Sequence, residues 1–237
     1  APRAPQRGEG SLSEAFRPGG PGGKSPDREE ALLAVLGLGP GSGEEEIRIA
    51  YRRLVKRWHP DSSGPLGSVR QFERVTRAYK ILKASPRRLP GPPDGASAKY
   101  RRVVEAGEDL FALGQILASD PDAGAREAAV RRLGLSGRTA AYVFLRRALY
   151  DREPRVAAAA VRAVALLGAR QAEGEVAALY SRAPLELRRV IIDTAAATGE
   201  PLFKSSLVAA KTDADPLLAL KARNLVAGLD KERKAGG

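Results

Sequence analysis

Apolar residues recur every three to four positions in three stretches between residues 27 and 84, which is the period of amphipathic helices. The apolar stripes of these stretches, in chain order, are Ala31, Leu32, Val35 and Leu36; Ile47, Tyr51, Leu54, Val55 and Trp58; and Phe72, Val75, Tyr79 and Leu82. The pattern predicts three helices, with the aromatic residues of the stripes serving as core.

Capping signals define where these three helices begin. Each opens with a polar residue that is followed three positions later by Glu or Gln, in the pairs Asp27–Glu30, Ser42–Glu45 and Ser68–Gln71. The run LGLGPGSG ends the first helix, and prolines at positions 60 and 86 follow the other two. Three acids at 44–46 lie at the start of the second helix, where its dipole favours negative charge.

A second helical pattern repeats over residues 98–229. Prolines at 121, 154, 184 and 216 follow one another at steps of 33, 30 and 32, and each opens a helical segment. Three segments end at Gly168, Gly199 and Gly228, and the first reaches Gly134 or a little beyond. An amphipathic stretch precedes each segment, so the unit is a helix pair. Since a single pair cannot bury its apolar face, we expect about four pairs to stack into an α-solenoid.

Composition divides the rest of the chain. Residues 1–26 are rich in Pro, Gly and Ser and are expected to be a disordered arm, and residues 85–97 hold four prolines and are expected to be a linker. The predicted architecture is all-α: a helical domain at 27–84, the linker, a repeat domain at 98–230 and a basic tail at 231–237.

Several classes of chemistry are excluded by residue counts. The 237 residues contain no cysteine and one histidine, which excludes disulfides, Cys-based zinc sites and two-His catalysis, so we expect no cofactor and no metal. No apolar run reaches about 18 residues, so we expect a cytoplasmic protein with no membrane partner. The net charge of +12 permits acidic partners, including nucleic acid, without requiring one.

The single histidine lies in the tripeptide His59-Pro60-Asp61, directly after the basic second helix. Alone, this tripeptide would be an ordinary turn. Here it follows Leu36-Gly37 and Ala50-Tyr51-Arg52, and precedes Phe72 and Ala78-Tyr79. Residues 29–84 therefore resemble a J-domain of the DnaJ family, since tripeptide, order and helix phase agree.

The resemblance implies a non-catalytic stimulator of a DnaK-type heat-shock chaperone. The basic second helix and the His-Pro-Asp loop would bind the chaperone and favour the arrangement in which it hydrolyses ATP. The predicted chaperone-binding residues are His59, Pro60, Asp61, Arg48, Arg52, Arg53, Lys56 and Arg57. The five cations lie off the apolar stripe of the second helix, so all five are expected to be exposed.

The repeat domain resembles HEAT-like arrays, most clearly in DREPRVAAAAVRAVALLG at 151–168. The chain lacks a Gly/Phe-rich stretch and a cysteine zinc module, which indicates a specialised J-protein whose array binds a protein client or partner. The alternative is a nucleic-acid-binding or scaffold protein with an accessory J-domain. Its candidate contacts lie on the second helices: Arg126, Arg131, Arg132, Arg155, Arg162, Arg188, Arg189, Lys221 and Arg223.

Overall fold

The computed structural model describes residues 26–59, 67–84, 107 and 109–235, and these residues form eleven α-helices, three short 3-10 turns and no strand. The predicted arm, except for Pro26, and the predicted linker at 85–97 lie outside them. The chain's all-α class is thus confirmed for the part described. None of the described helices combines the length and apolar character that crossing a bilayer requires.

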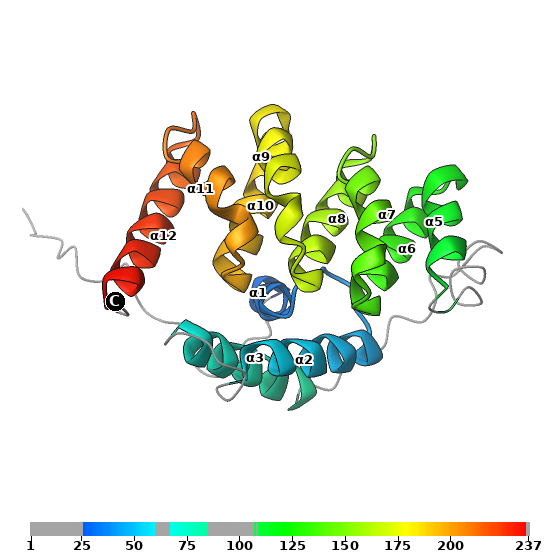
Figure 1. Cartoon of the computed structure of the whole chain (residues 1–237), viewed down its shortest axis with the longest axis horizontal. Helices are drawn as coiled ribbons and strands as arrows, with labels where there is room; N and C mark the ends of the chain where they lie inside the picture. Colours follow the sequence, from blue (N-terminus) through cyan, green and yellow to red (C-terminus); the bar gives the residue numbers. More distant parts are fainter. Residues whose placement is uncertain (1–25, 60–66, 85–106, 108, 236–237) are drawn as a thin grey trace, which may run out of the picture.

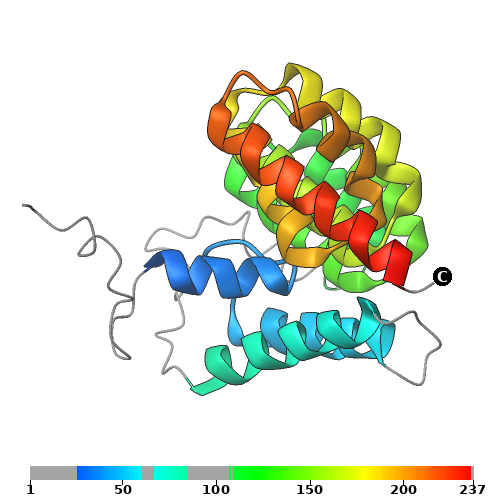
Figure 2. The same cartoon turned by 90° about the vertical axis from the view of Figure 1, so that its left-hand side faces the viewer.

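The N-terminal unit consists of α1 (Pro26–Val35), α2 (Glu44–Trp58) and α3 (Gly67–Ala84). Helices α2 and α3 form an antiparallel hairpin (Figure 2). The rings of Tyr51 and Tyr79 stack between them, 3.9 Å apart and nearly parallel. Leu54 and Val75 are buried in the hairpin, as their helical phase predicts.

Helix α1 packs against α3 on one side and against the C-terminal helix α10 on the other. It therefore buries more than one stripe: Leu33, which the pattern did not select, is buried, whereas Ala31 is exposed. The chain then turns through Gly37, which has φ 69° and which packs against Leu166 of the C-terminal half. A helix with two packing partners cannot be assigned a single buried face from its sequence.

The start of α2 differs by one residue from the prediction. Gly43 is the N-cap, and its backbone N–H donates to the Glu46 carboxylate at 3.0 Å. Ser42 instead donates its hydroxyl to the Gly39 carbonyl at 2.9 Å. Helix α3 begins at Gly67, one residue before the predicted Ser68, and the Gln71 amide lies against Gly199. The tight turn after Gly41 shifts the α2 cap by one position.

The C-terminal half is built from helix pairs in two layers (Figure 1). The first layer contains α5 (Leu110–Ser119), α7 (Tyr142–Ala148), α9 (Glu173–Arg182) and α11 (Lys204–Ala210). The second contains α6 (Ala123–Ser136), α8 (Pro154–Leu167), α10 (Leu185–Thr198) and α12 (Pro216–Ala235). Contacts run from α6 to α8, from α8 to α10 and from α10 to α12. The row curves around the N-terminal unit, which lies beneath it in Figure 1.

The ends of the second-layer helices repeat at a fixed step. Helices α6, α8 and α10 end at Gly137, Gly168 and Gly199, 31 residues apart, and each glycine adopts the left-handed conformation with φ between 66° and 69°. Glycine tolerates this conformation because it has no Cβ. The end predicted at Gly228 is wrong: α12 continues through that glycine to Ala235, into the predicted tail.

A polar turn also repeats at 31 residues, before α6, α8 and α12. The carboxylates of Asp120, Asp151 and Asp213 each accept a hydrogen bond, at 2.8–2.9 Å, from the backbone N–H two positions later. The corresponding position before α10 is Arg182, and the residue two positions later is Pro184, which has no N–H to donate. The aspartate is replaced at the one step where its donor is missing.

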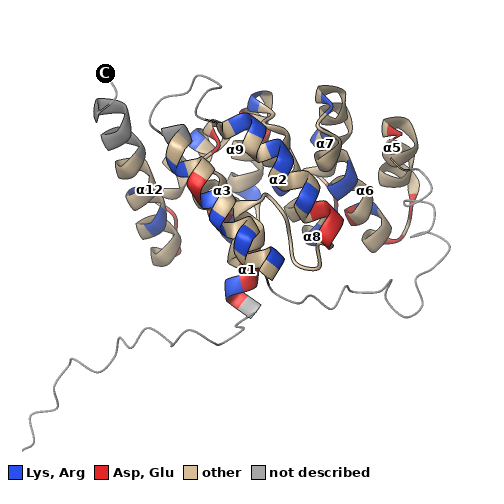
Figure 3. Ribbon diagram, turned by 90° about the horizontal axis from the view of Figure 1, so that it is seen from below, with Lys and Arg blue, Asp and Glu red and all other residues tan. Residues whose placement is uncertain are grey.

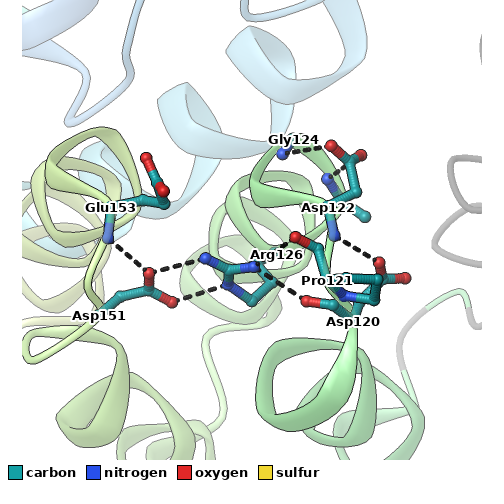
Figure 4. Close-up of polar contacts among 8 residues, drawn as sticks. Asp120, Pro121, Asp122, Gly124, Arg126, Asp151 and Glu153 are labelled. Carbon is teal, nitrogen blue, oxygen red and sulfur yellow. Dashed lines mark hydrogen bonds and ion pairs between the residues drawn. The ribbon is translucent and has the colours of Figure 1, made fainter.

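In two of these turns the aspartate binds an arginine of the preceding second-layer helix. Arg126 of α6 donates two hydrogen bonds to the Asp151 carboxylate, at 2.8 and 2.9 Å, and a third to the Asp120 carbonyl (Figure 4). Arg188 of α10 donates a single hydrogen bond, at 2.6 Å, to the Asp213 carboxylate, which also accepts one from the Tyr180 hydroxyl. Burial acts to raise the pKa of the Asp151 carboxyl, but the hydrogen bonds from Arg126 and from the backbone outweigh it and hold that pKa below its ordinary value.

We predict that Arg126→Ala destabilises the helical array by about 3 kcal/mol, because it leaves the Asp151 carboxylate buried without its cation. Urea denaturation of the full chain measures this loss, with Arg152→Ala, an exposed arginine of the same turn, as the control. Because the pKa of Asp151 is depressed in the folded chain, the pair's contribution should be present at neutral pH and fade as acid protonates that carboxylate. Equal unfolding free energies for the two variants would contradict the assignment.

Candidate functional site

Helix α2 divides its five predicted binding cations between two sides. Arg48, Arg52 and Lys56, spaced four residues apart, are exposed. Seen from the side opposite the C-terminal helices, α2 shows cationic positions along its length (Figure 3). Arg53 and Arg57 form a second row and are partly buried against those helices. The prediction that all five cations are exposed is therefore wrong for the second row.

The buried row reaches the carboxyl ends of two neighbouring helices. Arg53 donates from Nη1 to the carbonyl of Gly134, in the last turns of α6, at 2.8 Å. Arg57 donates from Nη2 to the carbonyl of Leu166 in α8, also at 2.8 Å. The four residues between Arg53 and Arg57 advance α2 by about 6 Å. Packed helices such as α6 and α8 lie about 8–10 Å apart, and the long arginine side chains span the difference. One α2 arginine thus serves each of the helices α6 and α8.

Helix α3 makes the corresponding contact with the next helix of the row. Arg74 donates to the carbonyl of Ala196 near the end of α10 at 3.0 Å. The same three helices end in the repeating glycines, and each glycine lies against one side chain of the hairpin: Gly137 against Arg53, Gly168 against Arg57, and Gly199 against Gln71. The last carbonyls of a helix carry partial negative charge, so cationic donors are well placed there.

Arg57 carries the most heavily buried ion pair of this contact. Its Nη1 lies 2.6 Å from Oε1 of Glu200, and the two side chains are 24% and 6% exposed. Burial raises the pKa of the Glu200 carboxyl, and Arg57 acts against that rise. Apolar residues join the two halves beside this pair, because Leu135 and Leu166 of the array belong to the same buried cluster as Leu36 and Leu54.

His59 ends α2 with an extended backbone, as expected for a residue that precedes proline. Its half-buried ring packs edge-on against Phe72 of α3, with centroids 5.8 Å apart. The Phe72 ring of α3 thereby stabilises the position of the His59 ring. Pro60 and Asp61, the other members of the predicted tripeptide, lie outside the described residues.

Five of the nine cations proposed for nucleic acid are engaged with acids. Arg126, Arg188 and Lys221 pair with acids at 2.5–2.8 Å. Two more, Arg131 and Arg189, also contact acids, the former reaching Glu46 of α2. These side chains hold the helices together, and their paired charge is less available to a phosphate backbone.

Sequence reasoning missed the anchoring role of Gln71, Arg74 and Glu200. No sequence pattern marks these three residues. Their role follows from the position of the carboxyl ends of the array helices. Two signals were present: Arg53 and Arg57 form a row separate from the outer cations, and Gly168 and Gly199 end helices at a regular step. Neither signal predicts that the arginine row contacts the helix-ending glycines.

Comparison with known proteins agrees with the geometry of the hairpin and of His59. The DnaJ domain family matches residues 32–90. Residues 32–90 are a DnaJ domain. Domains of this kind, also called J-domains, do no chemistry themselves and stimulate the ATPase of an Hsp70-type chaperone. The N-terminal unit is therefore called the J-domain below, and the second half the array.

Similar curated proteins align with the J-domain portion. Chaperone protein DnaJ 1 of Aromatoleum aromaticum is 46% identical over 59 residues, which are 25% of this chain and 17% of that protein. DnaJ homolog subfamily C member 16 of Gallus gallus is 33% identical over 84 residues, 35% of this chain and 9% of the relative. Chaperone protein DnaJ of Bacillus mycoides is 43% identical over 54 residues, which are 23% of this chain and 15% of that protein. The chain thus spans less than a fifth of these relatives, and no solved structure matches it significantly.

We predict that Arg57→Ala loosens the J-domain from the array, because the carbonyls of α8 lose their donor and the buried Glu200 carboxylate loses its cation, at a cost of about 3 kcal/mol. The chain has no native cysteine, so spin labels can be placed uniquely at Lys80→Cys and Lys204→Cys. The distance distribution between the labels should be narrow in the parent and broad in the variant. Arg52→Ala, on the outer row of the same helix, should leave it narrow; broadening in both variants, or in neither, would contradict the anchor.

Proposed function

We propose that this protein is a specialised co-chaperone, whose J-domain binds a DnaK-type heat-shock chaperone and stimulates its ATP hydrolysis. The observation that carries the proposal is the DnaJ match at residues 32–90, which contains His59-Pro60-Asp61 directly after a helix with an exposed row of cations. The contacting residues would be that tripeptide with Arg48, Arg52 and Lys56. Arg53 and Arg57 are less suited to the role, because their guanidinium groups already donate to the array.

The mechanism would be a shift in the partner's conformations. Exposed cations steer the encounter with an acidic surface and chiefly raise the association rate, an effect that salt weakens. The tripeptide would then bind better to the hydrolysis-ready form of the chaperone than to its resting form, and such differential binding shifts the population toward it. His59, supported by Phe72, would supply the polar contact, Pro60 the loop shape and Asp61 an acceptor for a cationic group.

We further propose that the array is a short HEAT-like α-solenoid that holds a protein client or partner. Stacked helix pairs, each in contact with its neighbours, and the 31-residue step of the helix-ending glycines support this interpretation. The J-domain covers the carboxyl ends of α6, α8 and α10. It leaves accessible the end of the array that begins with α5. There a groove of about 360 Å³ lies between α5 and α7, beside Phe111, whose side chain is 76% exposed.

An exposed aromatic side chain beside a concave, partly apolar groove is typical of a surface that contacts another protein. Phe111 packs edge-on against Phe144, which fixes both rings at the rim of the groove. The nucleic-acid alternative gains no comparable support, because five of the nine array cations on which it relied lie in ion pairs with acids.

We predict that the full chain raises steady-state ATP turnover by a DnaK-type chaperone and that His59→Gln reduces this stimulation to the basal rate. The substitution keeps a polar side chain while removing the imidazole, so the helical circular dichroism and melting temperature should stay close to those of the parent. Arg53→Ala serves as a comparison, since its guanidinium faces the array. Stimulation by His59→Gln equal to that of the parent would refute the proposed role.

A further inference from the structure

Cations gather on the side of the hairpin that faces away from the array, and they come from both of its helices (Figure 3). We call this the outer cationic face and define it by Arg48, Arg52 and Lys56 of α2 with Arg70, Arg77 and Lys80 of α3, all of which are exposed. The α3 members are not part of the α2 row considered so far. They lie opposite the buried residues of their helix, Val75, Ala78 and Leu82.

The α3 row is strongly one-sided in charge. Helix α3 carries five cations and a single acid, Glu73, over its 18 residues. Within the part of the chain that the structure describes, Arg77, Lys80 and Lys83 form no ion pair. Several array cations of similar exposure, such as Arg146 and Lys221, pair with an acid of a neighbouring helix. Positive charge on the hairpin is therefore concentrated, and among the described residues no acid pairs with Arg77, Lys80 or Lys83.

The two helices that carry the rows are held in fixed positions. The stacked rings of Tyr51 and Tyr79 join α2 to α3, and the contacts of Arg57 and Arg74 attach the two helices to the array. The axes of packed helices lie about 8–10 Å apart. A partner thus meets cations from two fixed, adjacent helices rather than from a single helix.

We infer that the α3 cations Arg77 and Lys80 extend the chaperone-binding surface across the hairpin and contact an acidic protein surface together with the α2 row. The inference rests on the proposed function. An acidic protein fits better than single-stranded nucleic acid, because the aromatic rings of both helices pack within the hairpin and leave none on this face for base stacking. The two rows together also cover a broader area than α2 alone.

The test compares two double charge reversals in the chaperone ATPase assay. Arg77→Glu/Lys80→Glu changes the outer cationic face, and Arg152→Glu/Arg155→Glu makes the same change of charge on exposed array positions. The first variant should need about tenfold more protein for half-maximal stimulation, with the maximal rate unchanged, because the loss falls on electrostatic association. Its salt dependence should also flatten, while the control behaves as the parent. Melting curves of all three proteins establish that folding is preserved.

Three outcomes would overturn the inference. If the parent stimulates ATP turnover and both variants match it, the α3 row is a solvated surface and the proposed function stands. If the α3 variant instead loses binding to a 30-base-pair DNA duplex while keeping full stimulation, the partner of this face is nucleic acid. If the parent gives no stimulation at all, the proposed function fails, and the inference fails with it.

Discussion

The placement of the J-domain depends on one interaction, the donation of arginine N–H groups to the carbonyls at the ends of the array helices. Those carbonyls have no partner within their own helices. Arg53, Arg57 and Arg74 meet them at α6, α8 and α10 in turn. The close approach of Arg53 and Arg57 is possible because Gly137 and Gly168 carry no Cβ. A repeat that ends its helices identically offers a row of identical sites, and a straight helix with arginines one turn apart matches two of them.

Because of this contact, the two flanks of helix α2 have different roles. The inner flank is structural: its arginines are partly buried, and Arg57 shares a buried ion pair with Glu200. The outer flank keeps a complete row of cations four residues apart, and α3 adds a second row beside it. The array therefore fixes the orientation of the J-domain without covering the face that a chaperone would meet.

The array is held by its own repeating chemistry. An aspartate in the turn before a helix organises that turn and also receives an arginine from the preceding helix, as at Asp151 and Asp213. Where the chain places alanine at position 157 instead of the arginine, it places Arg182 instead of the aspartate. The two positions change together within a single chain, because a buried charge without its partner would be costly in either place.

The sequence alone determined the helices and their phase, the J-domain and its tripeptide, and the pairing of helices after residue 98. Periodicity and capping are local properties, and a specific tripeptide in a specific helical context leaves few alternatives. Tertiary structure decided which cations are exposed and why Leu33 is buried. Helical phase places Arg53 and Arg57 off the apolar stripe of α2, which is correct, but only the position of the array makes that side an interface. Which charges remain free for a partner is thus a property of packing between segments more than eighty residues apart in the chain, such as Arg53 with Gly134 and Arg57 with Glu200, and no local pattern records it.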